Sequence, residues 1–172
     1  MKKLIVPICI LLFSTSALAQ TRSRTTKRGT QSSKASSQQA SVEAKTAGAT
    51  KVADQIKNLT RFLYLLGGVA KGIEDLDASA RSNQGSPTAL QQNEQNKAKL
   101  RSTFQDFRIG FDQLEVFFRS TPELEQYYLK LAGSAAGAAT AEDQAAAGHF
   151  DQAGRTMLGV VNRLTDVLLA MR

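Results

Sequence analysis

The feature that most constrains the fold of this sequence is a repeat of apolar residues at alternating spacings of four and three. From Ala49 onward the repeat consists of Val52, Ile56, Leu59, Leu63, Leu66, Ala70 and Ile73. Residues at these spacings share one face of an α-helix, because the helix completes a turn every ~3.6 residues. The repeat therefore predicts an amphipathic helix over about residues 49–79.

Further segments show the same periodicity. A second helix is predicted over about residues 89–119, after a run of turn-forming residues at 81–87. Its apolar face consists of Leu100, Phe104, Phe107, Phe111, Leu114 and Phe118. Because aromatic residues at this spacing face the interior of a bundle, we expect core packing and not an aromatic ligand pocket. A last helix is predicted over about residues 149–171.

The segment between these two helices has a clear beginning and end. Thr121 suits a helix cap, and Pro122 suits the first helical position. The alanine-rich run that follows predicts a helix to about residue 147, ended by Gly148. Residues that favour an interruption within it are Gly133, Gly137 and Thr140. Residues 144–153 resemble the turn of a tetratricopeptide repeat, and in the absence of a second copy the resemblance implies only a helix-turn-helix.

Together these segments predict an all-α fold with a disordered N-terminal tail. Amphipathic helices joined by short turns bury their stripes best in an antiparallel bundle with up-down-up-down order. A helix of thirty residues is about 45 Å long, so we expect an elongated bundle of about four helices over residues 49–172. The main alternative is a long two-helix hairpin with a smaller helical pair docked on one end.

Residues 1–19 have the organisation of a cleaved secretory signal peptide. Two lysines precede an apolar run, Leu4–Phe13, and a small-x-small cleavage site, Ala17–Ala19, comes before Gln20. The run is about half as long as a membrane-spanning helix needs to be. We therefore expect a secreted or periplasmic protein that does not span the membrane after processing and that has lost its only cysteine, Cys9.

The composition changes sharply near residue 48. Residues 20–48 are rich in Ser, Thr, Gln and Ala, and Val42 is their only large apolar residue. Such a segment buries too little surface to offset its ordering entropy, so we expect it to be disordered. Six cations and one acid give it a net charge of +5, whereas residues 49–172 carry fourteen Lys and Arg against fourteen Asp and Glu.

The cations of this tail are candidate contacts to an anionic surface, such as lipid headgroups or envelope polymers. They include Arg22, Arg24, Lys27, Arg28 and Lys34. The alternative is a solvated linker that keeps the protein soluble and has no fixed partner. Nucleic acid is not an expected partner, because the tail has no aromatic residue to stack on bases.

Few residues suggest chemistry. His149, the single histidine, lies near Asp151 at a helix start and is not part of a Glu-x-x-His motif, so we expect an exposed or capping residue and not a metal ligand. Glu74, Asp75 and Asp77 are expected to form a solvated helix end, because a calcium site needs more oxygen ligands than this segment offers. We therefore expect no catalytic residues, no cofactor and no metal.

Ile109 and Val116 lie seven residues apart and away from the main stripe of the second helix. Either they contact a third helix inside the bundle, or they form an apolar seam for a partner. The sequence thus favours a non-catalytic helical-bundle protein that acts through protein–protein contacts, including self-association. The alternatives are an envelope-tethering module that uses the basic tail and a bundle that binds a small ligand or cofactor.

Overall fold

The computed structural model describes residues 30–82 and 84–172, with side chains from residue 37 onward. This part of the chain consists of helices and contains no strand, which confirms the predicted all-α fold. The elements are α1 (Thr30–Arg81), α2 (Pro87–Ser120), the 3-10 helix η1 (Pro122–Leu124), α3 (Glu125–Leu131), α4 (Ser134–Ala146) and α5 (Phe150–Ala170).

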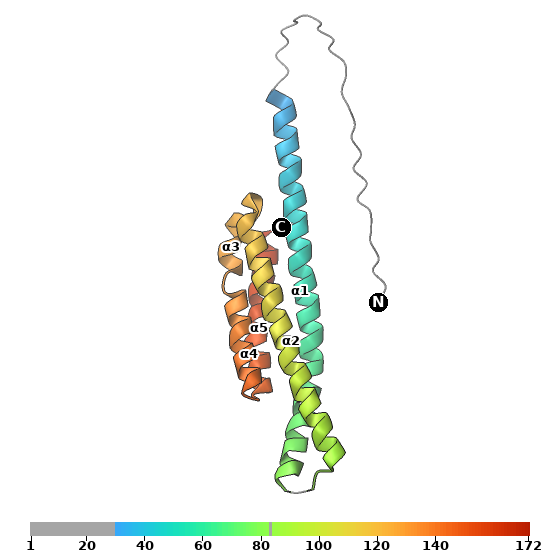
Figure 1. Cartoon of the computed structure of the whole chain (residues 1–172). Coiled ribbons are helices and arrows are strands. Elements are labelled where there is room, and N and C mark those ends of the chain that lie inside the picture. The colour runs from blue at the N-terminus through green and yellow to red at the C-terminus, as the bar shows by residue number, and fades with distance from the viewer. Residues whose placement is uncertain (1–29, 83) are drawn as a thin grey trace, which may run out of the picture.

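The helices form four rods that pack as an elongated antiparallel bundle (Figure 1). α1 and α2 form a hairpin, and η1, α3 and α4 return along α2 as the third rod. α5 then runs back between α4 and α1, so that the last helix closes the ring on the first. This is the predicted up-down-up-down order.

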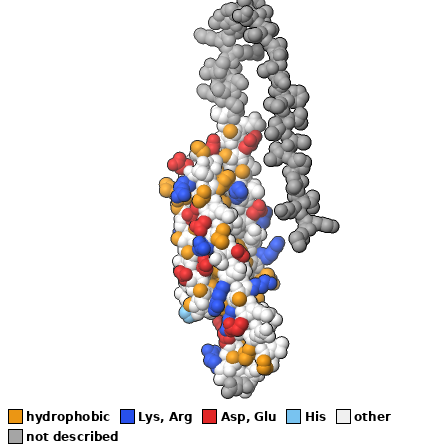
Figure 2. All heavy atoms as spheres, in the orientation of Figure 1, with side chains coloured by type: hydrophobic (Ala, Val, Ile, Leu, Met, Phe, Trp, Pro, Cys, Tyr) orange, Lys and Arg blue, Asp and Glu red, His pale blue; other side chains and the backbone are white. Residues whose placement is uncertain are grey.

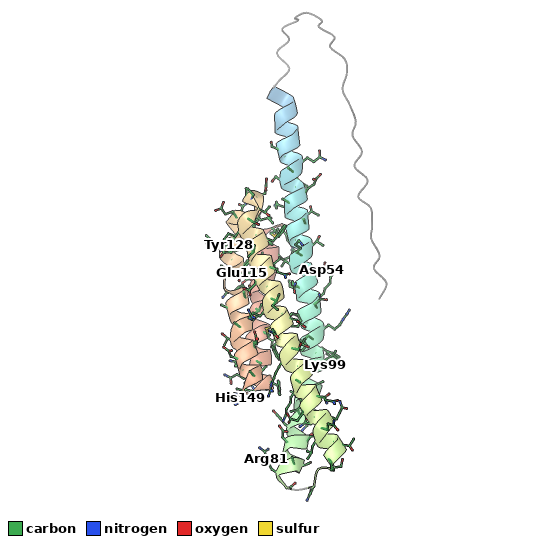
Figure 3. The ribbon with its side chains drawn as sticks, viewed as in Figure 1. Asp54, Arg81, Lys99, Glu115, Tyr128 and His149 are labelled. Carbon is green, nitrogen blue, oxygen red and sulfur yellow. The ribbon has the colours of Figure 1, made fainter. Side chains whose placement is uncertain are left out.

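The α1–α2 hairpin is longer than the α4–α5 pair. Arg81, near the tip of the hairpin, lies well beyond His149, which marks the end of that pair (Figure 3). The far end is therefore a two-helix segment, a feature of the alternative fold considered above. Polar groups join its helices, since Asn93 Nδ2 and Lys97 Nζ each donate to Asp77 Oδ1 over 2.7 Å. The hydrogen bond to Asp77 is the main reason that the pKa of Lys97 is raised.

The core follows the predicted stripes. The buried residues of α1 include Val52, Leu59, Leu66, Ala70 and Ile73, and those of α2 include Leu100, Phe104, Phe111, Leu114 and Phe118. The ring of Phe62 meets that of Phe104 edge to face, with the centroids 5.1 Å apart. The phenylalanines thus pack in the core, as predicted. The third rod approaches α5 closely, because a Cβ atom at Gly137 would lie 3.0 Å from Val160 Cγ2.

The first helix begins earlier than the composition predicts. Residues 37–48, which we expected in the disordered tail, are part of α1. Tertiary contacts account for the difference. Gly48 is buried, and a Cβ atom there would lie 3.0 Å from Leu124 Cδ1 of η1. Lys45 Nζ lies 5.8 Å from the ring centroid of Tyr127 in α3, within reach of a cation–π interaction.

The third rod is interrupted, as predicted, and the break falls at Gly133. This residue has a φ of +90°, a left-handed conformation that glycine adopts without strain. Arg163 of α5 donates a hydrogen bond to the carbonyl of Ala132. Glu115 Oε1 of α2 accepts a 2.9 Å hydrogen bond from the first turn of α4. Gly137 and Thr140, the other residues that favoured a break, lie inside α4.

The predicted helix ends are confirmed at Gly148 and Pro122. Gly148 follows α4 with a φ of +85°, and Pro122 is the first residue of η1. The prediction that the Thr121 side chain caps the following helix is wrong. Its hydroxyl makes no hydrogen bond to η1 and instead donates to the carbonyl of Phe117 in α2 over 2.8 Å. Thr121 therefore closes the end of α2.

Candidate functional site

The residues predicted to contact an anionic surface are ones whose side chains the structure does not describe. The residues concerned are Arg22, Arg24, Lys27, Arg28 and Lys34. The first four precede the described residues, and the fifth lies in the first turns of α1, where only the backbone is described. The predicted signal peptide also lies outside the described residues.

Ile109 and Val116 lie on the outer side of α2, and their side chains are 41% and 52% exposed. The interpretation that they contact a third helix is therefore wrong. Their neighbours along the helix include Asp112 and Gln113, which are also exposed. Isolated apolar side chains on a polar face are ordinary on soluble proteins. The partner seam stays a prediction.

The residues weighed for chemistry do not converge on one site. His149 is exposed at the N-terminal end of α5, as predicted, and its side chain makes no capping hydrogen bond. Asp75 pairs with Lys71 over 3.2 Å on the surface, whereas Asp77 binds α2 and Glu74 lines a different surface. Among the described side chains, no group of three or more His, Cys, Asp or Glu is placed to hold a metal.

A surface that the sequence analysis did not single out lies on α1. Residues 62–70 contain no charged side chain. Tyr64 is 85% exposed, Leu65 58% and Val69 38%. A helix that is apolar on all sides is normally buried on all sides. Here the main neighbours of α1 are α2 and α5, so part of this apolar helix faces solvent.

Open glycines complete this surface, which we call the α1 band. The band consists of Tyr64, Leu65, Gly67, Gly68, Val69 and Gly72. A Cβ atom added at any of its three glycines would meet no atom within 4 Å. The band thus combines protruding apolar side chains with places where another backbone can approach closely. Three glycines in an exposed helix also lower its helix propensity, a cost that close contact with another chain would offset.

A groove between α1 and α5 adjoins the band. Its volume is about 690 Å³. The apolar residues along it are Leu63, Leu66, Ala70, Phe150, Gly154, Leu158 and Val161. The two helices are close at its floor, because a Cβ atom at Gly154 would lie 3.0 Å from Leu66 Cδ2. Tyr64 and Gly67 belong to both the groove and the band.

The charges of the bundle are mixed on the face that Figure 2 draws. On the face drawn in Figure 2, acidic and basic side chains are interspersed with hydrophobic ones. This agrees with the balance of charges over residues 49–172. The sequence signal for the α1 band was the uncharged run Phe62–Ala70, which is broader than the single stripe that a bundle helix needs.

Comparisons with known protein families, with curated proteins and with solved structures find no match to this chain. In the part that the structure describes, no helix is both long enough and apolar enough to cross a membrane. The surface itself must therefore indicate the function. An exposed apolar band beside an apolar groove is suited to bind another apolar surface, because association removes both from water.

Proposed function

We propose that this chain is an exported protein that performs no catalysis and acts through protein–protein contacts, as a small adaptor or structural component of the cell envelope. The observation that carries the proposal is the exposure of the α1 band. Contact with water makes such a surface unfavourable, and a partner that covers it gains the free energy of burial. The leader-like pattern of residues 1–19 supports the export of the chain.

The α1 band is a better candidate than the seam at Ile109 and Val116. Residues that dominate binding energy tend to be aromatic and to lie where apolar surface is continuous. Tyr64 is a largely exposed aromatic residue beside a groove, whereas the seam offers two aliphatic side chains among polar ones. Burial of the tyrosine ring by a partner would therefore contribute more than burial of the seam.

Site-specific photo-crosslinking in native envelopes tests the proposal. A benzoylphenylalanine at Leu65 should give a discrete crosslinked protein product. The same probe at Gln152, an exposed polar residue of α5, is the matched control and should give none. A probe at Val116 tests the alternative surface. A product at Val116 alone would move the binding site to α2, and no product at any position would contradict a binding function.

The groove between α1 and α5 favours a second candidate, the binding of a small apolar ligand. Its volume of about 690 Å³ lies within the range of small-molecule sites, and most of its floor is apolar. Native mass spectrometry of the protein purified from its envelope should then show an added ligand mass. Leu158→Glu places a charge at the groove and should abolish that mass while the helical content stays unchanged.

A further inference from the structure

We propose that a second copy of this chain covers the α1 band, through an antiparallel contact between the two α1 helices centred on Gly68. The inference rests on the proposed function and names the partner. It starts from the line Arg61, Gly68 and Asp75, whose members are seven residues apart and all exposed. Seven residues correspond to almost two full turns, so these three share the outermost line of the helix.

An antiparallel pair centred on Gly68 is complementary in charge. Each residue before Gly68 then faces the residue equally far after Gly68 in the other copy. Arg61 therefore faces Asp75 of the second copy, and the second copy's arginine faces the first copy's aspartate. Asp75 lies at the surface, where its pairing with Lys71 over 3.2 Å leaves it accessible to a further cation. Two symmetric ion pairs flank the apolar centre.

The same register is complementary in shape. Tyr64 lies four residues before Gly68 and Gly72 lies four residues after it, so each tyrosine faces an open glycine. The centre is a glycine against a glycine, which permits close approach of the two backbones. One helix thus carries both the protruding side chains and the recesses that accept them.

The flanking charges select this orientation over a parallel one. Cations, Lys57 and Arg61, precede the band, whereas carboxylates outnumber Lys71 in the segment 71–77 that follows it. A parallel pair would place Arg61 against Arg61, which is repulsive, and an antiparallel pair places Arg61 against Asp75. Charge pairs of this kind contribute orientation, and the buried apolar band contributes affinity.

A surface that is complementary to a second copy of itself about one point is suited to a twofold-symmetric homodimer, the commonest oligomer. In a twofold dimer the same patch of both copies forms the interface, so that residue i contacts residue j and residue j contacts residue i. The pairs Arg61 with Asp75 and Tyr64 with Gly72 satisfy this condition. The contact also closes on itself, so it produces a dimer and not a filament.

Sedimentation velocity of the exported full chain measures the dimer. Gly68→Gln should weaken self-association at least tenfold, because the new side chain occupies the dimer centre. It should leave the monomer folded, since space around Gly68 is open and glutamine favours a helix over glycine. Gly159→Gln is the matched control, because Gly159 is an equally open and exposed glycine on α5, and this variant should dimerise like the wild type.

Charge-reversal and cysteine variants test orientation and register. Arg61→Asp should weaken the dimer, and the double variant Arg61→Asp with Asp75→Arg should restore it, which happens only if these residues face each other. Gly68→Cys should form a disulfide-linked dimer on oxidation, because the symmetry axis brings position 68 next to its own copy. Gly159→Cys should stay monomeric under the same conditions.

The outcomes separate this inference from the proposed function. A wild-type chain that is monomeric at about 100 μM would overturn the dimer, since a Kd of micromolar order would be visible there. A crosslink from Leu65 to a different protein would then leave the proposed binding function in place. A dimer that is insensitive to Gly68→Gln would overturn the α1 interface. A monomer without any crosslinked product would contradict both proposals.

Discussion

Phe111 shows how strongly the stability of this bundle depends on single buried side chains. It is fully buried in α2, and its ring stacks on that of Phe107 with the centroids 6.1 Å apart. Gln113, two residues further along, is exposed. Removal of a buried ring leaves a cavity that the surrounding helices cannot fill, whereas removal of an exposed amide lets water take its place.

Phe111→Ala should therefore lower the free energy of unfolding by about 3–5 kcal/mol, as truncations of buried aromatic residues do. Gln113→Ala on the same turn should change it by no more than about 0.5 kcal/mol. Denaturant titrations followed by circular dichroism measure both values. Equal costs for the two variants would contradict the placement of α2 against the core.

At the scale of elements, α1 differs from the other helices because it extends beyond the bundle. Its N-terminal part projects past the remaining helices in Figure 1. A lone helix is only marginally stable in water, so packing and not propensity must hold the helix where it first meets the bundle. That point is defined by Lys45 over the Tyr127 ring and by the buried Gly48.

Two deletions locate this point. Deletion of residues 20–40 should leave the melting temperature nearly unchanged, because the contacts described between this end of α1 and η1 and α3 involve Lys45 and Gly48, which the deletion keeps. Deletion of residues 20–48 should lower the free energy of unfolding by about 1–2 kcal/mol, since it removes the Lys45–Tyr127 contact and exposes Leu124. Thermal unfolding followed by circular dichroism distinguishes the two. An equal loss in both variants would mean that the earlier residues also pack on the bundle.

At the scale of the whole molecule, charge and apolar surface are separated along the chain. Residues 20–48 carry a net charge of +5, and residues 49–172 are balanced. The α1 band lies within the bundle, on residues 64–72. Attachment to an anionic surface and contact with a protein partner would therefore use different parts of the molecule and can be tested separately.

Replacement of the four arginine and lysine residues at positions 22, 24, 27 and 28 by glutamine should abolish binding to anionic vesicles. Each cation contributes up to about 1 kcal/mol near such a surface, and salt screens that contribution. Co-sedimentation across a salt series measures the binding, and circular dichroism should show an unchanged fold. Binding that persists in the variant or at high salt would place the contact on the bundle.

The sequence by itself determined the helices of the bundle and most of their ends. The stripe through Leu59 and Leu66 and the left-handed Gly148 are local features, and local backbone geometry dictates them. Periodicity also selected the buried set correctly, including Phe104 and Phe111. These features follow from the order of neighbouring residues and need no knowledge of which helices come together.

Only the tertiary structure decided which apolar residues stay uncovered. Periodicity specifies a direction around a helix, whereas burial depends on whether another element lies in that direction. Val116 was expected either to contact a helix or to form a seam, and the arrangement of the bundle left it on the surface. The start of α1 depended on contacts with η1 and α3, which are distant in sequence. The α1 band also depends on the tertiary arrangement. Residues 62–70 of α1 are apolar around most of the helix, but its main neighbours α2 and α5 cover only part of that surface.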